Sequence, residues 1–339
     1  MDHTKRSGLA MRLKAGVSRY LRQNTGIWIA LFLLLIVMAV AAPAFFRAQN
    51  LSNMFRTLST NMLLTLGMSF CLLIGGIDLS IGQSVAICGV ITAMLMQAGV
   101  PWGAAAGAGV LLGALIGLVN GSVITYTGVP AFIATIAMQG IVKGAAFIIG
   151  QGSSIMVTDQ GFYHFGNGYV LGIVPVPVLL LIAAAVFCYL VWNRTTFGSY
   201  MYAIGGNLNA SRFSGIRTDH IQVVCYTLAG VMAGIAGVIL VARMMGGHPN
   251  LGDGKELDAI ASAVIGGVSF AGGRGTVGGA VMGAVVMGVL CNGMNVWGLN
   301  TYWQYVIKGL VILLAVLTDQ FIIRRGGIFP RHTEHKGEA

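Results

Sequence analysis

Long apolar runs separated by short polar segments dominate the chain. A helix that spans a membrane needs about 20 mostly apolar residues. The apolar runs lie at about 27–46, 58–75, 83–98, 103–124, 130–149, 175–193, 220–243, 257–269, 276–296 and 302–323. The run at 257–269 is short for an upright span, but we count it as a crossing because its removal would place the two ends of the chain on opposite sides. The pattern predicts an all-α polytopic membrane protein with about ten transmembrane helices.

The ten runs divide into two halves of similar plan. Each half has a long run followed by a glycine-rich polar break that contains an aspartate, GGIDLSIG at 75–82 and GGHPNLGDGKELD at 246–258. With five crossings in each half, the second half would be inverted in the membrane. Inverted repeats with broken helices are a common plan of transporters, with the substrate path near the repeat interface.

The composition supports a membrane location. Hydrophobic residues make up 56% of the 339 residues and charged residues only 9%, whereas an ordinary soluble domain is about 25% charged. This excludes a cytosolic enzyme and a nucleic-acid-binding domain.

The basic residues indicate the orientation, because Lys and Arg are enriched in cytoplasmic loops. Six of them fall in an expected cytoplasmic segment at 1–26, before a permease domain at 27–323 and a basic cytoplasmic tail at 324–339. The other basic residues expected on the cytoplasmic side are Arg194, Arg212, Arg217, Arg274, Arg324, Arg325, Arg331 and Lys336. Those expected outside are Arg47, Arg56, Arg243 and Lys255.

Glycines recur every four residues in two of the runs. Such small-residue faces let helices approach closely, so we assign them packing and no chemistry. The two series are Gly109, Gly113, Gly117 and Gly121, and then Gly275, Gly279 and Gly283. The five cysteines lie in apolar runs without metal-ligand spacing, so we expect buried thiols, no disulfide and no metal site.

A basic loop at 194–218 contains the signals of a short helix. Gly205 and Gly206 permit a tight bend, Asn207 is a suitable N-cap, and Gly215 is a suitable C-terminal stop. We therefore expect a helix at about 203–215 on the cytoplasmic face, with Ala210, Ser211 and Arg212 within it. This helix either docks onto a partner and transmits its motion, or is part of a solvated connecting loop.

Two lysines fall inside expected spans, each four residues after a glutamine. Gln139 with Lys143, and Gln304 with Lys308 beside Trp303, therefore share a helix face. A charge inside a membrane is costly and faces a cavity or a partner. The alternatives are a substrate path and a structural pairing or surface position of the lysine.

Asp78 is the acidic residue that we expect within the membrane, in the first glycine-rich break. With Ser80 it either caps the following helix or contributes to a gate. Asn120 lies in the glycine stripe, and Asn292 and Asn295 share a helix face. These asparagines either line a path or form hydrogen bonds between helices.

Several motifs are missing from the sequence. It contains no G-x-x-x-x-G-K-[ST] nucleotide loop, no H-E-x-x-H and no G-x-S-x-G. The chain is therefore not expected to hydrolyse ATP, to bind a cofactor or to act as an intramembrane enzyme. Because Asp78 is the only expected intramembrane acid, an ion-coupled secondary transporter or channel is the alternative rather than the main hypothesis.

Five ordered blocks carry a resemblance to a known family. They are GGIDLSIG (75–82), GLVNGSVITYTGVPAFIATIAM (117–138), TTFGSYMYAIGGNLNASRFSGI (195–216), ELDAIASAVIGGVSFAGGRGT (256–276) and YWQYVIKGLVILLAVLTD (302–319). The chain resembles the membrane permease subunits of bacterial ABC importers for monosaccharides, the group for ribose, arabinose, xylose and autoinducer-2.

This resemblance implies a fold similar to that of the vitamin B12 importer permease and a place in the bacterial inner membrane with both termini cytoplasmic. It implies a second permease copy, identical or paralogous, two ABC ATPase subunits that hold ATP and Mg²⁺, and a periplasmic sugar-binding protein. The 194–218 loop would then be the contact that couples the permease to the ATPase.

Overall fold

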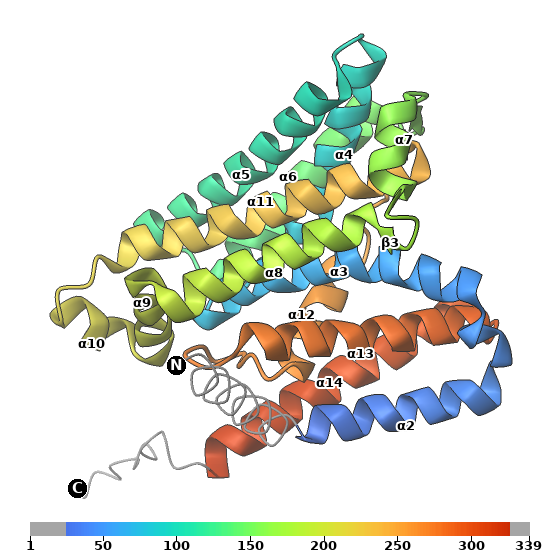
Figure 1. Cartoon of the computed structure of the whole chain (residues 1–339). Helices are drawn as coiled ribbons and strands as arrows, with labels where there is room; N and C mark the ends of the chain where they lie inside the picture. Colours follow the sequence, from blue (N-terminus) through green and yellow to red (C-terminus); the bar gives the residue numbers. More distant parts are fainter. Residues whose placement is uncertain (1–24, 326–339) are drawn as a thin grey trace, which may run out of the picture.

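The computed structural model describes residues 25–325, and this part of the chain is almost entirely helical (Figure 1). Residues 1–24 and 326–339, which hold most of the two expected basic end segments, lie outside the described part. The first half contains α2 (Thr25–Ala41), the 3-10 helix η1 (Pro43–Phe46), α3 (Ala48–Leu73), α4 (Ile81–Gln97), α5 (Trp102–Thr127) and α6 (Ala131–Gly150).

The second half begins with a small irregular region and then returns to long helices. Its elements are β1 (Ile155–Met156), α7 (Gln160–Asn167), β2 (Tyr169–Val170), β3 (Val174–Pro175), α8 (Val176–Arg194), α9 (Thr196–Gly206), α10 (Leu208–Phe213), α11 (Thr218–Met244), β4 (Gly246–Gly247), α12 (Lys255–Ile265), α13 (Val277–Val296) and α14 (Thr301–Arg325). Every apolar run of the sequence forms a helix, which confirms the all-α polytopic prediction.

Length and hydropathy qualify six helices of residues 25–325 as candidate membrane spans, namely α5, α6, α8, α11, α13 and α14. Gly26–Ala41 and Ile81–Gln97 are shorter apolar helices. The eighth run differs from the expectation, because α12 has only 11 residues. At 1.5 Å per residue it is about 16 Å long, roughly half of the hydrocarbon core of a bilayer, so this helix does not cross by itself.

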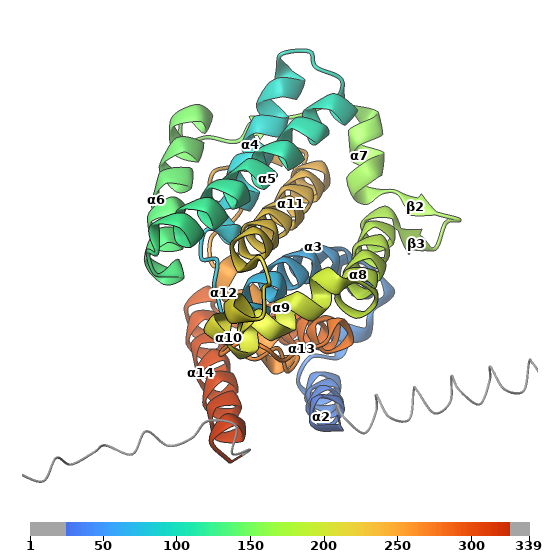
Figure 2. The same cartoon turned by 90° about the vertical axis from the view of Figure 1, so that its left-hand side faces the viewer.

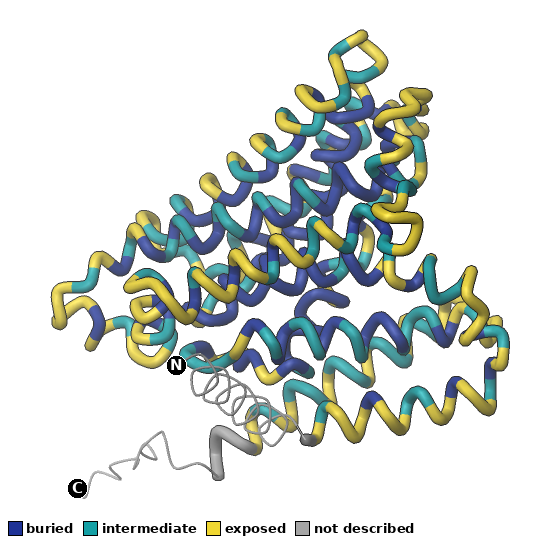
Figure 3. The backbone as a smooth tube through the Cα atoms, in the orientation of Figure 1, coloured by how far each residue is buried: buried dark blue, intermediate teal, exposed yellow. Residues whose placement is uncertain are grey.

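The core of the molecule lies where α3, α4 and α11 meet (Figure 3). The C-terminal half of α3 is buried on all sides, and an 18-residue window of α11 is 67% buried. The corresponding window of α14 has no buried residue. Because an apolar helix that its own chain does not cover needs another apolar neighbour, α14 faces lipid or another protein.

The glycine stripes bring helices together as predicted, except that Gly275 lies in the loop before α13 and is not part of its helix face. A Cβ atom at Gly113 would collide with the Gly230 carbonyl oxygen of α11, and one at Gly117 would collide with the Tyr226 carbonyl oxygen. The later stripe does the same between α13 and α12, where Gly283 lies against the Ser262 carbonyl oxygen. Only glycine fits at these positions.

Residues that are distant in sequence meet at two opposite ends of the molecule. At one end, α7 contacts Trp102, Asn167 accepts a hydrogen bond from Arg56 at 2.6 Å, and β1 pairs antiparallel with β4. At the other end, Leu73 accepts a hydrogen bond from the backbone of Gly273 at 2.9 Å, close to α9. We call these the α7 end and the α10 end.

Two polar segments are arranged differently from the expectation. The polar piece after the first run belongs to α3, which begins at Ala48. Its side chains are satisfied by tertiary partners, since Asn50 bonds reciprocally with Asn292 and Ser52 bonds with Tyr169 at 2.8 Å. Lys255, expected on the outer surface, instead starts α12 inside the molecule, where that helix contacts α3 and α13.

Candidate functional site

The expected short helix near residue 207 is present, but it is one of two. Thr195 caps α9, Asn207 follows α9, and the Asn207 side chain accepts a hydrogen bond from the Ala210 backbone N–H at 2.9 Å as the N-cap of α10. Gly215 has a φ of +82° after α10, a conformation that favours glycine. The predicted cap and stop are therefore confirmed.

The prediction that Gly205 and Gly206 form a bend is wrong, because both residues lie in the last turn of α9. Gly205 is needed for close approach instead. A Cβ atom on it would collide with the Leu73 carbonyl oxygen and the Gly273 backbone nitrogen, whereas one on Gly206 would meet open space.

Two further contacts connect α9 and α14 to the loop between α12 and α13. Tyr202 of α9 donates a hydrogen bond to the Gly275 carbonyl oxygen at 2.8 Å, and burial raises the pKa of its phenol, which keeps it protonated. Asp319 of α14 accepts from the Phe270 backbone N–H at 3.0 Å. The end of α3, the loop at 269–276 and α9 thus form one contact region at the α10 end.

Beyond this region, α10 carries the remaining residues of the expected coupling set. Ser211 is buried and donates to the Asn207 carbonyl oxygen at 2.9 Å. Arg212 pairs with Asp219 at the start of α11 at 2.7 Å. Phe213, at the C-terminal end of α10, is 92% exposed, so the end of this short helix offers a large apolar side chain to whatever covers it.

Asp78 lies in the break between α3 and α4 and is fully enclosed by protein. Its Oδ1 atom accepts hydrogen bonds from the Ser80 backbone N–H at 2.9 Å and from the Ser80 hydroxyl at 2.6 Å. Asn120 donates to the Ser80 hydroxyl oxygen at 2.8 Å. Ser80 is the residue before α4, and no side chain caps the helix, so the expected cap is replaced by a turn that Asp78 closes ahead of α4 and that Asn120 braces from α5.

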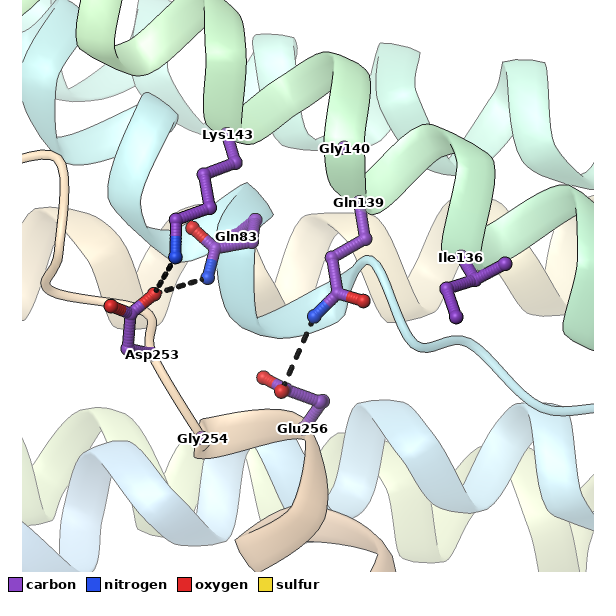
Figure 4. A pocket seen from close by; sticks show the side chains of 8 residues that line it. All are labelled: Gln83, Ile136, Gln139, Gly140, Lys143, Asp253, Gly254 and Glu256. Atoms are coloured by element: carbon purple, nitrogen blue, oxygen red, sulfur yellow. Dashed lines mark hydrogen bonds and ion pairs between the residues drawn. The ribbon is translucent and has the colours of Figure 1, made fainter.

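Gln139 and Lys143 share one face of α6, as their spacing predicts, and both line a cavity of about 440 Å³ (Figure 4). Lys143 forms an ion pair with Asp253 at 2.9 Å, and Gln139 donates to Glu256 Oε1 at 3.3 Å. Gln83 of α4 also donates to Asp253, at 2.6 Å. Three elements, α4, α6 and the segment that leads into α12, therefore build the cavity.

The second lysine pair lies at the far side of α12. Lys308 of α14 forms an ion pair with Asp258 at 2.9 Å, and this pair is more buried than the one between Lys143 and Asp253. Gln304 donates to Asn295 at 2.9 Å. Both Gln304 and Lys308 line a smaller cavity of about 140 Å³, whose lining residues do not include Trp303.

Asn292 forms hydrogen bonds between helices, since its two bonds with Asn50 join α13 to α3. Asn295 joins α13 to α14 through Gln304. The sequence thus identified one wall of each polar site, and of its two alternatives for these asparagines the structure shows hydrogen bonds between helices.

The expectation that Asp78 is the only acid inside the membrane-embedded body is wrong. Glu256 and Asp258 are only 8% and 9% exposed, and Glu256 contacts Gln139 near the midpoint of α6. From the sequence, both residues were expected in an outer polar loop. The available signal was their position directly before an apolar run too short to span, which is typical of a segment that re-enters the protein.

Comparisons with known proteins give the family. The family described as branched-chain amino acid transport system / permease component matches residues 50–316. The ribose import permease protein of Bacillus subtilis (strain 168) is 39% identical over 300 residues, which cover 88% of this chain and 93% of that protein. The D-allose transport system permease protein of Escherichia coli (strain K12) is 38% identical over 296 residues, which cover 86% and 90%.

A third relative is the L-arabinose ABC transporter permease protein of Azospirillum brasilense, 33% identical over 310 residues, which cover 91% of each chain. No solved structure matches the chain. The resemblance carried by the five sequence blocks is therefore confirmed. This chain belongs to the family of transport-system permease components that includes the permeases of ABC importers for monosaccharides.

Proposed function

We propose that this chain is the membrane-spanning, non-catalytic subunit of an ABC importer that passes a monosaccharide across the bacterial inner membrane. The observation that carries the proposal is the match to a ribose permease over 93% of that protein's length. Separate ATPase subunits hold ATP and Mg²⁺, and a periplasmic binding protein delivers the sugar.

We assign ten crossings to the chain, with the α10 end in the cytoplasm and the α7 end outside. The course of the chain supports this number, because α11 ends at the α7 end while α13 begins at the α10 end. Residues 245–276 therefore traverse the molecule, partly as irregular backbone and partly as α12. Arg194, Arg212, Arg217 and Arg274 all fall at the α10 end, in agreement with the positive-inside rule.

The coupling role belongs to the 194–218 loop. Its helix α10 is exposed at Phe213, and the adjoining α9 contacts Leu73 and the loop at 269–276 through Gly205. A push on α10 by an ATPase subunit would therefore reach α3 and the segment between α12 and α13 through α9.

A second permease copy would complete the path. Figure 2 shows α12 between α6 and α14 on one flank of the molecule, and the 440 Å³ cavity opens between α4, α6 and the segment before α12. Lys143 and Asp253 are 43% and 39% exposed there, and lipid is a costly environment for such charges. A partner permease on this flank would enclose them in an aqueous passage, the arrangement of a fold similar to the vitamin B12 importer permease.

The test is purification of the tagged chain from its native cells, followed by reconstitution. We expect an ATPase and a sugar-binding protein to co-purify, and we expect sugar uptake into vesicles only when both are present with ATP. Vesicles that hold this chain alone and accumulate sugar against its gradient, driven by Na⁺ or H⁺, would show a secondary transporter instead.

A further inference from the structure

One acidic side chain borders both polar cavities on the flank that carries α6, α12 and α14 (Figure 2). Asp253 and the adjacent Gly254 line the cavity of about 440 Å³ beside α6, and they also line the cavity of about 140 Å³ beside α14. The Asp253 side chain is 39% exposed. A molecule on this flank can therefore reach it, from either cavity.

The contacts of Asp253 use only one of its two carboxylate oxygens. Oδ1 accepts hydrogen bonds from Lys143 Nζ at 2.9 Å and from the Gln83 side-chain amide at 2.6 Å (Figure 4). Oδ2 has no hydrogen-bond partner within residues 25–325. Lys143 carries three N–H donors, is 43% exposed and uses one of these donors on Asp253. An exposed ammonium and an exposed carboxylate, each with unused hydrogen-bonding capacity, thus lie side by side.

This ion pair favours a neutral solute with hydroxyl groups. The opposite charges of Lys143 and Asp253 offset each other, so an ion gains little there unless it displaces one member of the pair. A hydroxyl group both donates and accepts, so one hydroxyl can donate to Asp253 Oδ2 while a second accepts from Lys143. Hydrogen bonds to ionised groups are stronger than those between neutral groups. An apolar solute would instead remove water from both charges without replacing it.

An aromatic ring lies on the other side of the same segment. Tyr305 of α14 lines the smaller cavity and is exposed, and a Cβ atom at Gly254 would be 4.0 Å from its Cε1 atom. Gly254 has a φ of +74°, a conformation that favours glycine. Small-molecule sites combine aromatic surface with a few polar groups. A sugar ring has C–H groups beside its hydroxyls, so it matches an aromatic ring that adjoins a polar pair.

We propose that Asp253, Lys143 and Tyr305 contact a neutral polyhydroxylated solute during its passage through the permease. Asp253 Oδ2 accepts a hydrogen bond from one hydroxyl, Lys143 donates to a second, and the Tyr305 ring packs against C–H groups of the solute. The inference rests on the proposed function and names residues that select the class of solute. Because only these few contacts form, the site is weak, which suits a solute that must leave again.

The first experiment measures whether water and sugar reach this site in the complete importer. Gly140 lines the larger cavity, and a Cβ atom there has open space, whereas the next residue, Ile141, is exposed but lines neither cavity. In an active background with the five native cysteines replaced by alanine, Gly140→Cys should react at least tenfold faster than Ile141→Cys with a membrane-impermeant thiosulfonate. The transported sugar should slow the reaction at Gly140→Cys. Equal rates at the two positions, or no effect of the sugar, would overturn the inference.

The second experiment tests the contacts by substitution. The complete importer is reconstituted with this chain, and ATP hydrolysis and sugar uptake are measured with D-ribose, D-allose and L-arabinose as probes. For Asp253→Asn we expect ATP hydrolysis stimulated by the loaded binding protein to stay within twofold of the wild type. Sugar imported per ATP should fall about tenfold, because a hydrogen bond to a charged acceptor is lost. Tyr305→Leu should lower it about fivefold, whereas Tyr305→Phe keeps the ring and should import normally.

The matched controls change the same residue types outside both cavities. Asp159→Asn removes a carboxylate while asparagine still caps α7, and Tyr302→Leu removes an exposed tyrosine of α14 that lines neither cavity. Both should leave the two readouts unchanged. The double variant Lys143→Gln with Asp253→Asn restores a neutral pair and should remain defective. Its full recovery would assign the pair to structure alone and overturn the inference.

The outcomes separate the inference from the proposed function. Unchanged sugar import per ATP in Asp253→Asn would overturn the inference, and so would a loss of ATP hydrolysis as large as the loss of import. If the wild-type complex imports none of the three sugars with ATP, the proposed function fails and the inference fails with it. If it imports one of them and Asp253→Asn behaves as the wild type, only the inference fails.

Discussion

Asp78 shows at the scale of a single residue how a buried acid is used as structure. One of its oxygens receives two hydrogen bonds from Ser80, and Asn120 of α5 reaches the same hydroxyl. The turn that leads into α4 thereby gains an acceptor for the Ser80 backbone N–H, which precedes the helix. The carboxylate is consequently part of the junction between α3, α4 and α5.

This interpretation predicts different results for two substitutions of Asp78. Asp78→Ala leaves several buried donors without an acceptor and should lower the free energy of unfolding by about 3 kcal/mol. Asp78→Asn keeps an acceptor oxygen and should cost about 1 kcal/mol. The measurement is denaturation in mixed micelles together with sugar uptake. Full stability of Asp78→Asn with loss of uptake would instead assign Asp78 to a gate.

The sequence predicted individual site residues where local spacing decides the outcome. Gln139 and Lys143 face the same way because four residues make about one helical turn. Their partners Asp253 and Glu256 could not be identified in this way. These two residues are more than 100 positions away in the sequence, and they reach α6 only because the polar segment before α12 folds back into the protein. The one local signal of the re-entry is the short apolar run that follows these residues, and it does not say which helix they reach.

At the scale of elements, the contact between α9, the end of α3 and the loop at 269–276 leaves no room for added volume at Gly205. Gly205 touches backbone atoms on both other elements, whereas its neighbour Gly206 borders open space. The two adjacent glycines in the last turn of one helix thus have opposite surroundings.

We therefore predict that Gly205→Ala lowers stability by about 2 kcal/mol, because backbone atoms must move apart. It should also reduce uptake more strongly than ATP hydrolysis. Gly206→Ala should change stability by less than about 1 kcal/mol, in the stabilising direction. Thermal unfolding in detergent and transport by the reconstituted importer are the measurements. Equal tolerance of both substitutions would contradict a tight contact at Gly205.

The elements themselves were largely predictable, since each apolar run forms a helix and each glycine stripe lies against a neighbour. The exceptions arose where tertiary partners replaced water around polar groups. α3 extends through a polar piece because Asn292 and Tyr169 satisfy its side chains. Similarly, the last turn of α9 retains Gly205 and Gly206 because packing holds them there.

At the scale of the whole molecule, the two ends should face opposite compartments. Leu171 in the β2–β3 hairpin at the α7 end is 93% exposed, and Phe213 on α10 at the other end is 92% exposed. In a cysteine-free background, Leu171→Cys should be modified by an impermeant reagent in intact spheroplasts. Phe213→Cys should be modified only in inside-out vesicles. The reverse result would invert the topology and remove α10 from the reach of an ATPase.

The length of α3 has a consequence for how the two sides of the membrane exchange information. Ser52 and Arg56 near its first residues hold the hairpin and α7, and its last residue, Leu73, adjoins Gly205 of α9. With 26 residues, α3 is a rod of about 39 Å. A binding protein that contacts the hairpin and an ATPase subunit that contacts α10 would therefore act on opposite ends of this one helix. An axial shift of α3 would then couple sugar delivery outside to ATP hydrolysis inside, without a chain of contacts through the other helices.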